Sequence, residues 1–332
     1  MAAPVSSLSS QPANKDPAHP NFRTTRADRG PWRQIFWITA GAVGVFFGIR
    51  ALPTGTNLSH VDFTVQGNSI EFCDPTNPQF IPVVSVRSPV TMELISVSPN
   101  PTAGQVVQAT AKLTTSTGKT IGPQDVLVTH TEKLHLLIFD PELHDYQHVH
   151  PVPGEHAGEW KFSFTPQVGG VYRLFADFTP IATARGLYSN VDLKIAPRLG
   201  ESIKMTAKPE RIGATRIVQD GIAYSLTSPD FPMKVRAVEN FHFSAARVDG
   251  KPANFEPVMD AYAHLVAVDD TRSGFAHLHP NQLVEVGKGD AATSELDFKV
   301  SIPHAGLYVI WAQVRVDGRD RYVPFWFNVE QG

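Results

Sequence analysis

The sequence predicts an all-β protein in which two tandem β-sandwiches follow one N-terminal transmembrane helix. The 332 residues suffice for two domains, and the contents of 42% hydrophobic and 18% charged residues favour folded cores over disorder. Proline (27 residues) and glycine (24 residues) are frequent, which is typical of short strands joined by turns. One apolar run without charges lies close to the N-terminus.

The first 52 residues predict a tail and a membrane anchor. Residues 1–33 are polar and carry five basic and two acidic side chains, a net charge of +3, so we expect a disordered cytoplasmic tail. Residues 34–52 contain the uncharged run IFWITAGAVGVFFGI, close to the ~17–25 apolar residues that span a bilayer. A cleaved signal peptide is the alternative, although Arg50-Ala51-Leu52 is a poor cleavage site.

The charge distribution predicts a location and excludes some functions. A basic tail stays in the cytoplasm, so we expect a single-pass protein of the bacterial inner membrane whose C-terminal domains are periplasmic. The net charge of -3 speaks against a nucleic-acid-binding surface. A single cysteine, Cys73, excludes an internal disulfide framework and a cysteine-rich zinc finger, and its own role stays open.

The remainder of the chain divides into a spacer and two strand-rich regions. Residues 53–90 contain five prolines and form the expected spacer. Alternation of apolar and polar residues predicts strands at 92–97, 106–113, 134–140, 160–164, 171–178 and 191–195 in the first region, 91–197. The second region, 198–332, has predicted strands at 203–206, 222–226, 241–248, 263–269, 296–300, 307–316 and 322–329. About seven short strands per ~110–130 residues are typical of an immunoglobulin-like β-sandwich.

The two regions resemble each other, which indicates a tandem duplication. The segment LHLLIFDPELHDYQHVHP (134–151) aligns without a gap with AHLVAVDDTRSGFAHLHP (263–280), at an offset of 129 residues. After a longer loop in the second copy, FSFTPQVGGVYRLFADF (162–178) aligns with FKVSIPHAGLYVIWAQV (298–314). The histidines are among the residues that both copies contain.

The histidine spacing predicts three imidazoles on one patch of each sheet. In His148-x-His150, the period of two along a strand puts both rings on one face. A hairpin that turns at residues 141–143 pairs Asp140 with Asp145, and the same register pairs His135 with His150. The equivalent residues of the second copy are His264, His277 and His279.

Three imidazole nitrogens suit Zn(II) or Cu(II), with an open position for a further ligand. Asp177 on the later strand is a candidate fourth ligand or a partner that orients a ligand in the first copy, and its counterpart Gln313 is a poorer ligand. His130 and its counterpart Met259 are further candidates, with a core or edge position as the alternative. The predicted metal site residues are His135, His148, His150, Asp177, His264, His277 and His279.

Two other interpretations remain open. The histidines could serve packing and hydrogen bonding in a structural or protein-interaction module of a cell-envelope complex. A metalloenzyme is the second, since cupin-type oxygenases also use His-x-His. The cupin motif, however, has a preceding glycine where this chain has Glu142. No nucleophile elbow, phosphate loop or dinucleotide fingerprint is present in the sequence.

The repeated motif resembles a known group of proteins. The repeats look like exported bacterial β-sandwich proteins akin to YtkA-like and heavy-metal-associated periplasmic domains. The resemblance rests on two patterns, His-Leu followed by Asp and Tyr/Phe-x-His-Val/Leu-His-Pro, and then Gly-x-Tyr-x-Leu/Ile-Phe/Trp-Ala-Asp/Gln. The resemblance covers roughly residues 91–330. It implies the sandwich fold and an association with the handling of copper or other heavy metals. We therefore expect an anchored, non-catalytic protein that binds copper or zinc, with an envelope or metal-handling protein as partner.

Overall fold

A computed structural model of the chain describes residues 30–51, 58–63, 79–199, 212–259, 261–281 and 293–332. The chain divides into two compact units, Met1–Thr54 and Gly55–Gly332. Cys73, the expected disordered tail up to residue 29 and the strand expected at 203–206 lie outside the described residues.

The N-terminal unit contains helix α1, Gly30–Ala51. An 18-residue window, Trp32–Ile49, is apolar enough to cross a membrane by length and composition, a test that an N-terminal signal sequence also passes. Its aromatic side chains, such as Trp37 and Phe47, are exposed. An apolar surface on all sides is typical of a helix that meets lipid.

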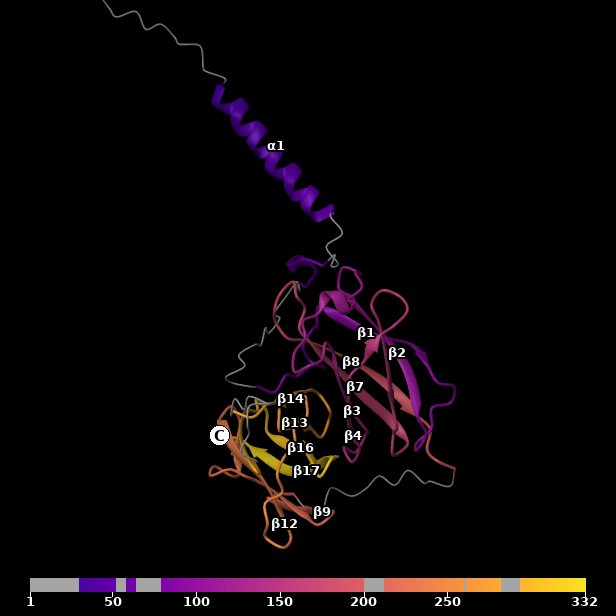
Figure 1. Cartoon of the computed structure of the whole chain (residues 1–332), viewed down its shortest axis with the longest axis vertical. Coiled ribbons are helices and arrows are strands. Elements are labelled where there is room, and N and C mark those ends of the chain that lie inside the picture. The colour runs from indigo at the N-terminus through magenta and orange to yellow at the C-terminus, as the bar shows by residue number, and fades with distance from the viewer. Residues whose placement is uncertain (1–29, 52–57, 64–78, 200–211, 260, 282–292) are drawn as a thin grey trace, which may run out of the picture. The chain divides into compact units, whose positions relative to one another are not determined.

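The first repeat is a sandwich of two antiparallel four-stranded sheets. One sheet has the order β1-β2-β6-β5 and the other β4-β3-β7-β8 (Figure 1). Their bounds are β1 Val90–Val97, β2 Val107–Thr115, β3 His135–Phe139, β4 Tyr146–Val149, β5 Val152–Pro153, β6 Glu159–Phe164, β7 Gly170–Phe178 and β8 Leu187–Ile195. Alternate side chains of the two sheets form one buried core, in which Leu113, Trp160 and Tyr172 are almost completely buried.

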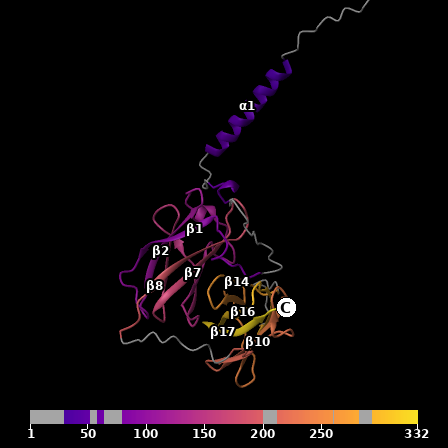
Figure 2. The same cartoon turned by 180° about the vertical axis from the view of Figure 1, so that it is seen from behind.

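The second repeat has the same plan, with sheets β15-β12-β10-β9 and β11-β17-β16-β13-β14 (Figure 2). Among the strands that the structure describes in this repeat, β11 alone is parallel to its neighbour, β17. The strands are β9 Arg216–Gln219, β10 Ile222–Thr227, β11 Met233–Lys234, β12 Val238–Arg247, β13 Ala263–Asp269, β14 Phe275–Leu278, β15 Glu295–Ser301, β16 Gly306–Val316 and β17 Arg319–Glu330. Two 3-10 helices, η1 His60–Phe63 and η2 Pro123–Asp125, precede the first histidine strand.

These strands confirm the predicted all-β fold of paired sandwiches. Strands β5, β9 and β11 have two to four residues and were not expected from the alternation. A window of that length contains too few residues to show a period.

The histidine-bearing sheets of the two repeats also pack against each other. The side chains of β3 alternate, so that Leu136 and Ile138 enter the core of the first repeat while Leu137 and Phe139 face outward. The outward face meets Val266 of β13 in a third buried cluster that contains residues of both repeats. Strands β3 and β13 are therefore buried on both faces along their whole length.

Part of the expected spacer belongs to this folded unit. The amide of Ile81 donates to the carbonyl oxygen of Phe275 at 2.8 Å, and the amide of Phe275 donates back to Ile81 at 3.1 Å. Phe80 lies in the core of the second repeat. The segment before β1 thus contacts the first repeat at Phe63 and the second repeat at Phe80.

Candidate metal centre

Two β-hairpins position the histidine triplets. In the first, β3 pairs with β4 so that Leu137 lies opposite His148 and Phe139 opposite Tyr146. The amide of Asp140 donates to the carbonyl oxygen of Asp145 at 3.2 Å, which closes the turn in the register expected from the sequence. In the second hairpin, Val266 lies opposite His277. The expected hairpin register is confirmed in both repeats.

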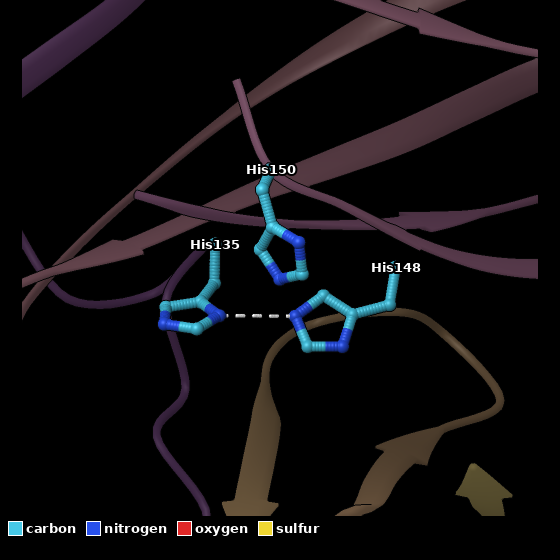
Figure 3. Close-up of side chains that lie close together, drawn as sticks. All are labelled: His135, His148 and His150. Atoms are coloured by element: carbon cyan, nitrogen blue, oxygen red, sulfur yellow. Dashed lines mark hydrogen bonds between the residues drawn. The ribbon is translucent and has the colours of Figure 1, made fainter. Parts of the chain in front are cut away.

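Each triplet forms a compact group. One nitrogen from each of His135, His148 and His150 lies within 4.8 Å of the other two, and the same holds for the triplet of the second repeat. Figure 3 shows the three rings of the first triplet pointing toward one another. The Nδ1 atom of His135 and the Nε2 atom of His148 are 3.2 Å apart. Neighbouring nitrogens of a tetrahedral zinc site, with Zn–N bonds of ~2.0–2.1 Å, are separated by about 3.3 Å.

Hydrogen bonds fix the protonation of the second triplet. The Nε2 atom of His264 donates to the carbonyl oxygen of Val258 at 2.9 Å, so Nδ1 keeps its lone pair. The Nδ1 atom of His277 donates to Oδ2 of Asp177 at 3.1 Å, so Nε2 keeps its lone pair. Within the described residues, His264 Nδ1, His277 Nε2 and His279 Nε2 are buried and have no hydrogen-bond partner.

The first triplet repeats this arrangement. The Nε2 atom of His135 donates to the carbonyl oxygen of Thr129 at 3.0 Å, which leaves Nδ1 as an acceptor. The Nδ1 atom of His148 lies 2.9 Å from Oε1 of Gln313, which as an amide oxygen accepts the proton and leaves Nε2 as an acceptor. Two lone pairs then face each other across 3.2 Å. A cation bound by both would turn this repulsion into attraction.

Asp177 and Gln313 are exchanged between the repeats. Asp177 lies opposite His135 in the strand register of its own repeat, but its hydrogen bond goes to His277 of the second repeat. Gln313 lies opposite His264, and its contact goes to His148 of the first repeat. Asp177 is thus placed as an orienting partner of the second triplet, and it does not belong to either compact group of ligand atoms.

Burial makes the charged imidazolium forms unfavourable. It lowers the pKa of every triplet histidine, that of His264 to about 4, and those of His148, His277 and His279 well below the usual range. Burial also raises the pKa of Asp177, against the opposing effect of His135. At neutral pH the six rings are therefore neutral, which is the form that binds metal.

His130 extends the cluster toward solvent. Its exposed ring stacks on His279, with centroids 3.7 Å apart and planes inclined by 15°. Residues 130 and 259 both have a positive φ, near 50°, so the turn that precedes each histidine strand has the same backbone form. The sequence identified His130 as a candidate ligand, but it gave no sign that this ring contacts a histidine of the second repeat. His144 and His156 are exposed loop residues outside both triplets.

The family comparison covers both sandwiches. Residues 90–192 and 216–331 match the family described as a domain of unknown function, DUF8832. The chain belongs to this family, because the match includes more than half of its length. A search of curated proteins found no match.

Solved structures resemble the chain at low identity. An Escherichia coli adhesin, FdeC, is 15% identical, with 72% of this chain and 64% of the adhesin covered and a TM-score of 0.22. Fibronectin(III)-like modules of Clostridium thermocellum CbhA are 12% identical, with coverages of 72% and 94% and a TM-score of 0.19. A Corynebacterium diphtheriae protein described as membrane anchored is 13% identical, with coverages of 73% and 59% and a TM-score of 0.21. The chain thus spans less than two thirds of the first and third structures, and scores this low carry no functional argument.

Proposed function

We propose that the two histidine triplets bind a transition metal, copper or zinc, and that the protein holds or transfers this metal without catalysing a reaction. The observation that carries the proposal is the second triplet. Its three buried nitrogens have no hydrogen-bond partner in the described part of the chain, and one nitrogen from each histidine lies within 4.8 Å of the others.

The cost of leaving these atoms unpaired supports metal binding over packing. An unsatisfied buried polar atom destabilises a folded protein by about 1–3 kcal/mol. Three such nitrogens in one group would concentrate this cost at a single site. A histidine that only packs needs no fixed protonation state. Here, His264 and His277 both donate their protons away from the group, which aims two lone pairs into it.

The donor set restricts the metal. Neutral imidazole nitrogens suit zinc and copper, whereas magnesium and calcium prefer oxygen ligands. The resemblance of the motif to heavy-metal-associated periplasmic domains agrees with this choice and does not carry it. The same expectation makes a metal-handling envelope protein the natural partner.

The proposed location is the outer face of a bacterial inner membrane, with α1 as an uncleaved anchor. The basic residues that precede the helix support this orientation. Alkaline washing of membranes tests the anchor: the full chain should stay in the pellet, and a chain without residues 1–51 should not.

Calorimetric titration of the full chain in detergent with Zn(II), and with Cu(I) under anaerobic conditions, tests the metal site. The double variant His148→Ala/His277→Ala, which removes one ligand of each triplet, should lose at least tenfold in affinity for zinc. The matched control is His156→Ala/His304→Ala, which removes one exposed histidine of each repeat. Equal binding by the wild type and His148→Ala/His277→Ala would favour the alternative, a structural module of an envelope complex with histidines that serve packing.

A further inference from the structure

We infer that the two triplets form one coupled dinuclear centre at the interface of the repeats, which accepts two monovalent copper ions but only one divalent ion. This inference rests on the proposed metal-binding function and adds its stoichiometry and the charge of its ions.

The distances between rings do not separate the two triplets. Within the first triplet, ring centroids are 4.8–5.3 Å apart. Across the interface, the ring of His277 lies 5.6 Å from that of His135 and 5.4 Å from that of His148, and His148 lies 6.2 Å from His264. The six imidazoles form one continuous cluster, because both triplets lie on the sheet faces that pack together.

The orienting hydrogen bonds also cross the interface. His277 of the second repeat depends on Asp177 of the first, and His148 of the first repeat depends on Gln313 of the second. A shift of one repeat that improves the geometry of one triplet therefore moves an orienting partner of the other. Two sites connected in this way are coupled in their binding free energies.

The charge of the cluster selects the ions. The six triplet ligands are neutral histidines, and among the hydrogen bonds of the described residues Asp177 supplies the one carboxylate that contacts them. Repulsion between two divalent ions is four times that between two monovalent ions at the same distance. Burial intensifies this repulsion, because His148 and His264 have less than a tenth of their surface exposed.

Coordination chemistry agrees with this selection. Cu(I) is a d10 ion that accepts three nitrogen ligands without a fourth, so each triplet can hold one. Zn(II) prefers four ligands, and the first ion is free to recruit a further imidazole or a water. Once one Zn(II) is bound, the second triplet faces a divalent charge without a second carboxylate.

Metal stoichiometry in the full chain in detergent is the first test. Anaerobic titration with Cu(I) against a chromophoric chelator should give two ions per chain, and titration with Zn(II) should give one. Two Zn(II) ions of similar affinity would overturn the inference while the proposed function stands. No binding of either metal would instead overturn the proposed function.

A thermodynamic cycle tests the coupling. His150→Ala leaves only the second triplet intact, and His279→Ala leaves only the first. If the ions repel each other, the product of the two single-site Cu(I) association constants should exceed the overall constant of the wild type at least tenfold. Agreement within twofold would mean independent sites. If an alanine variant loses the circular dichroism spectrum of a β-sheet protein, the asparagine variant at the same position replaces it. The zinc stoichiometry of the wild type tests the inference without any variant.

Discussion

The carboxylate of Asp177, on β7 of the first repeat, accepts a hydrogen bond from Nδ1 of His277 in the second repeat at 3.1 Å. The side chains of this pair are largely buried, with 19% and 7% of their surface exposed. The partnership assigns Asp177 to the triplet of the other repeat. Its position in the sequence alone would assign it to its own.

Asp177→Ala should therefore weaken the second triplet. Loss of an orienting partner typically costs 10–100-fold in metal affinity. We expect that loss for Zn(II) in a His150→Ala background, where the second triplet is intact, and a smaller effect in a His279→Ala background. Calorimetry measures both. Asp192→Ala, which removes an acid paired with Arg173, is the control, and a larger loss in the His279→Ala background would contradict the exchange of partners.

Acid should destabilise the metal-free protein. The triplet histidines have lowered pKa values in the folded state because burial disfavours their charged forms, whereas in the unfolded chain the pKa is about 6.5. Between about pH 6.5 and pH 4 the unfolded chain binds more protons, so the free energy of unfolding falls as the pH falls through this range. Above pH 6.5 this contribution is fully present.

Urea denaturation of the fragment Gly55–Gly332 in the presence of a chelator checks the direction. We expect the free energy of unfolding to be lower at pH 5 than at pH 7.5 by at least ~3 kcal/mol. Each histidine that is protonated in the unfolded chain but neutral in the folded protein lowers this free energy by about 1.4 kcal/mol for each pH unit below 6.5. The His277→Ala variant should show a smaller difference. Equal midpoints at the two pH values would show that the rings are not buried in the neutral form.

Phe175→Ala should destabilise both repeats. The side chain of Phe175 is completely buried in the inter-repeat cluster, with its ring 5.3 Å from that of Phe275. Truncation of a buried phenylalanine costs about 3–5 kcal/mol. We expect a loss of this size in urea denaturation, within one transition for both repeats. Val152→Ala, at an exposed edge position, should stay within about 0.5 kcal/mol, and an equally small effect of Phe175→Ala would exclude a stable interface.

Gly274→Ala should detach the segment that precedes the first repeat. A Cβ atom at residue 274 would lie 1.8 Å from the carbonyl oxygen of Ile81, which is backbone and must shift. The amides of Ile81 and Val84, which donate to Phe275 and Ser273, should then exchange hydrogen at least tenfold faster. Ser273→Ala adds no atom at this contact and is the control. Unchanged exchange would mean that the segment does not depend on this contact.

The hairpins could be predicted because their determinants are local. The turn between Asp140 and Asp145 fixes the register, and the period of two then places His135, His148 and His150 on one face. The same local reasoning works in the second copy. The grouping of each triplet follows from strand geometry and needs no knowledge of distant residues.

The environment of that face could not be derived in the same way. Residues 136–139 are all apolar, a pattern typical of a strand buried on both faces, and this pattern was the available sign of a covered outer surface. It does not identify what covers the strand. The second repeat covers the strand, and Asp177 and Gln313 are exchanged between the triplets. Both features depend on how two sheets that are distant in the sequence pack together.

The exchange of Asp177 and Gln313 between the repeats has a consequence for the chemistry of the centre. Two identical chains related by a two-fold axis would have to present the same residue at both orienting positions. Fusion of the copies into one polypeptide removes that requirement, so a carboxylate serves His277 and an amide serves His148. Each orienting residue still contacts the triplet of the opposite repeat, but one of the two is charged and the other is neutral. A pair of ions at this interface would therefore occupy two inequivalent positions, which a homodimer of a single repeat cannot provide.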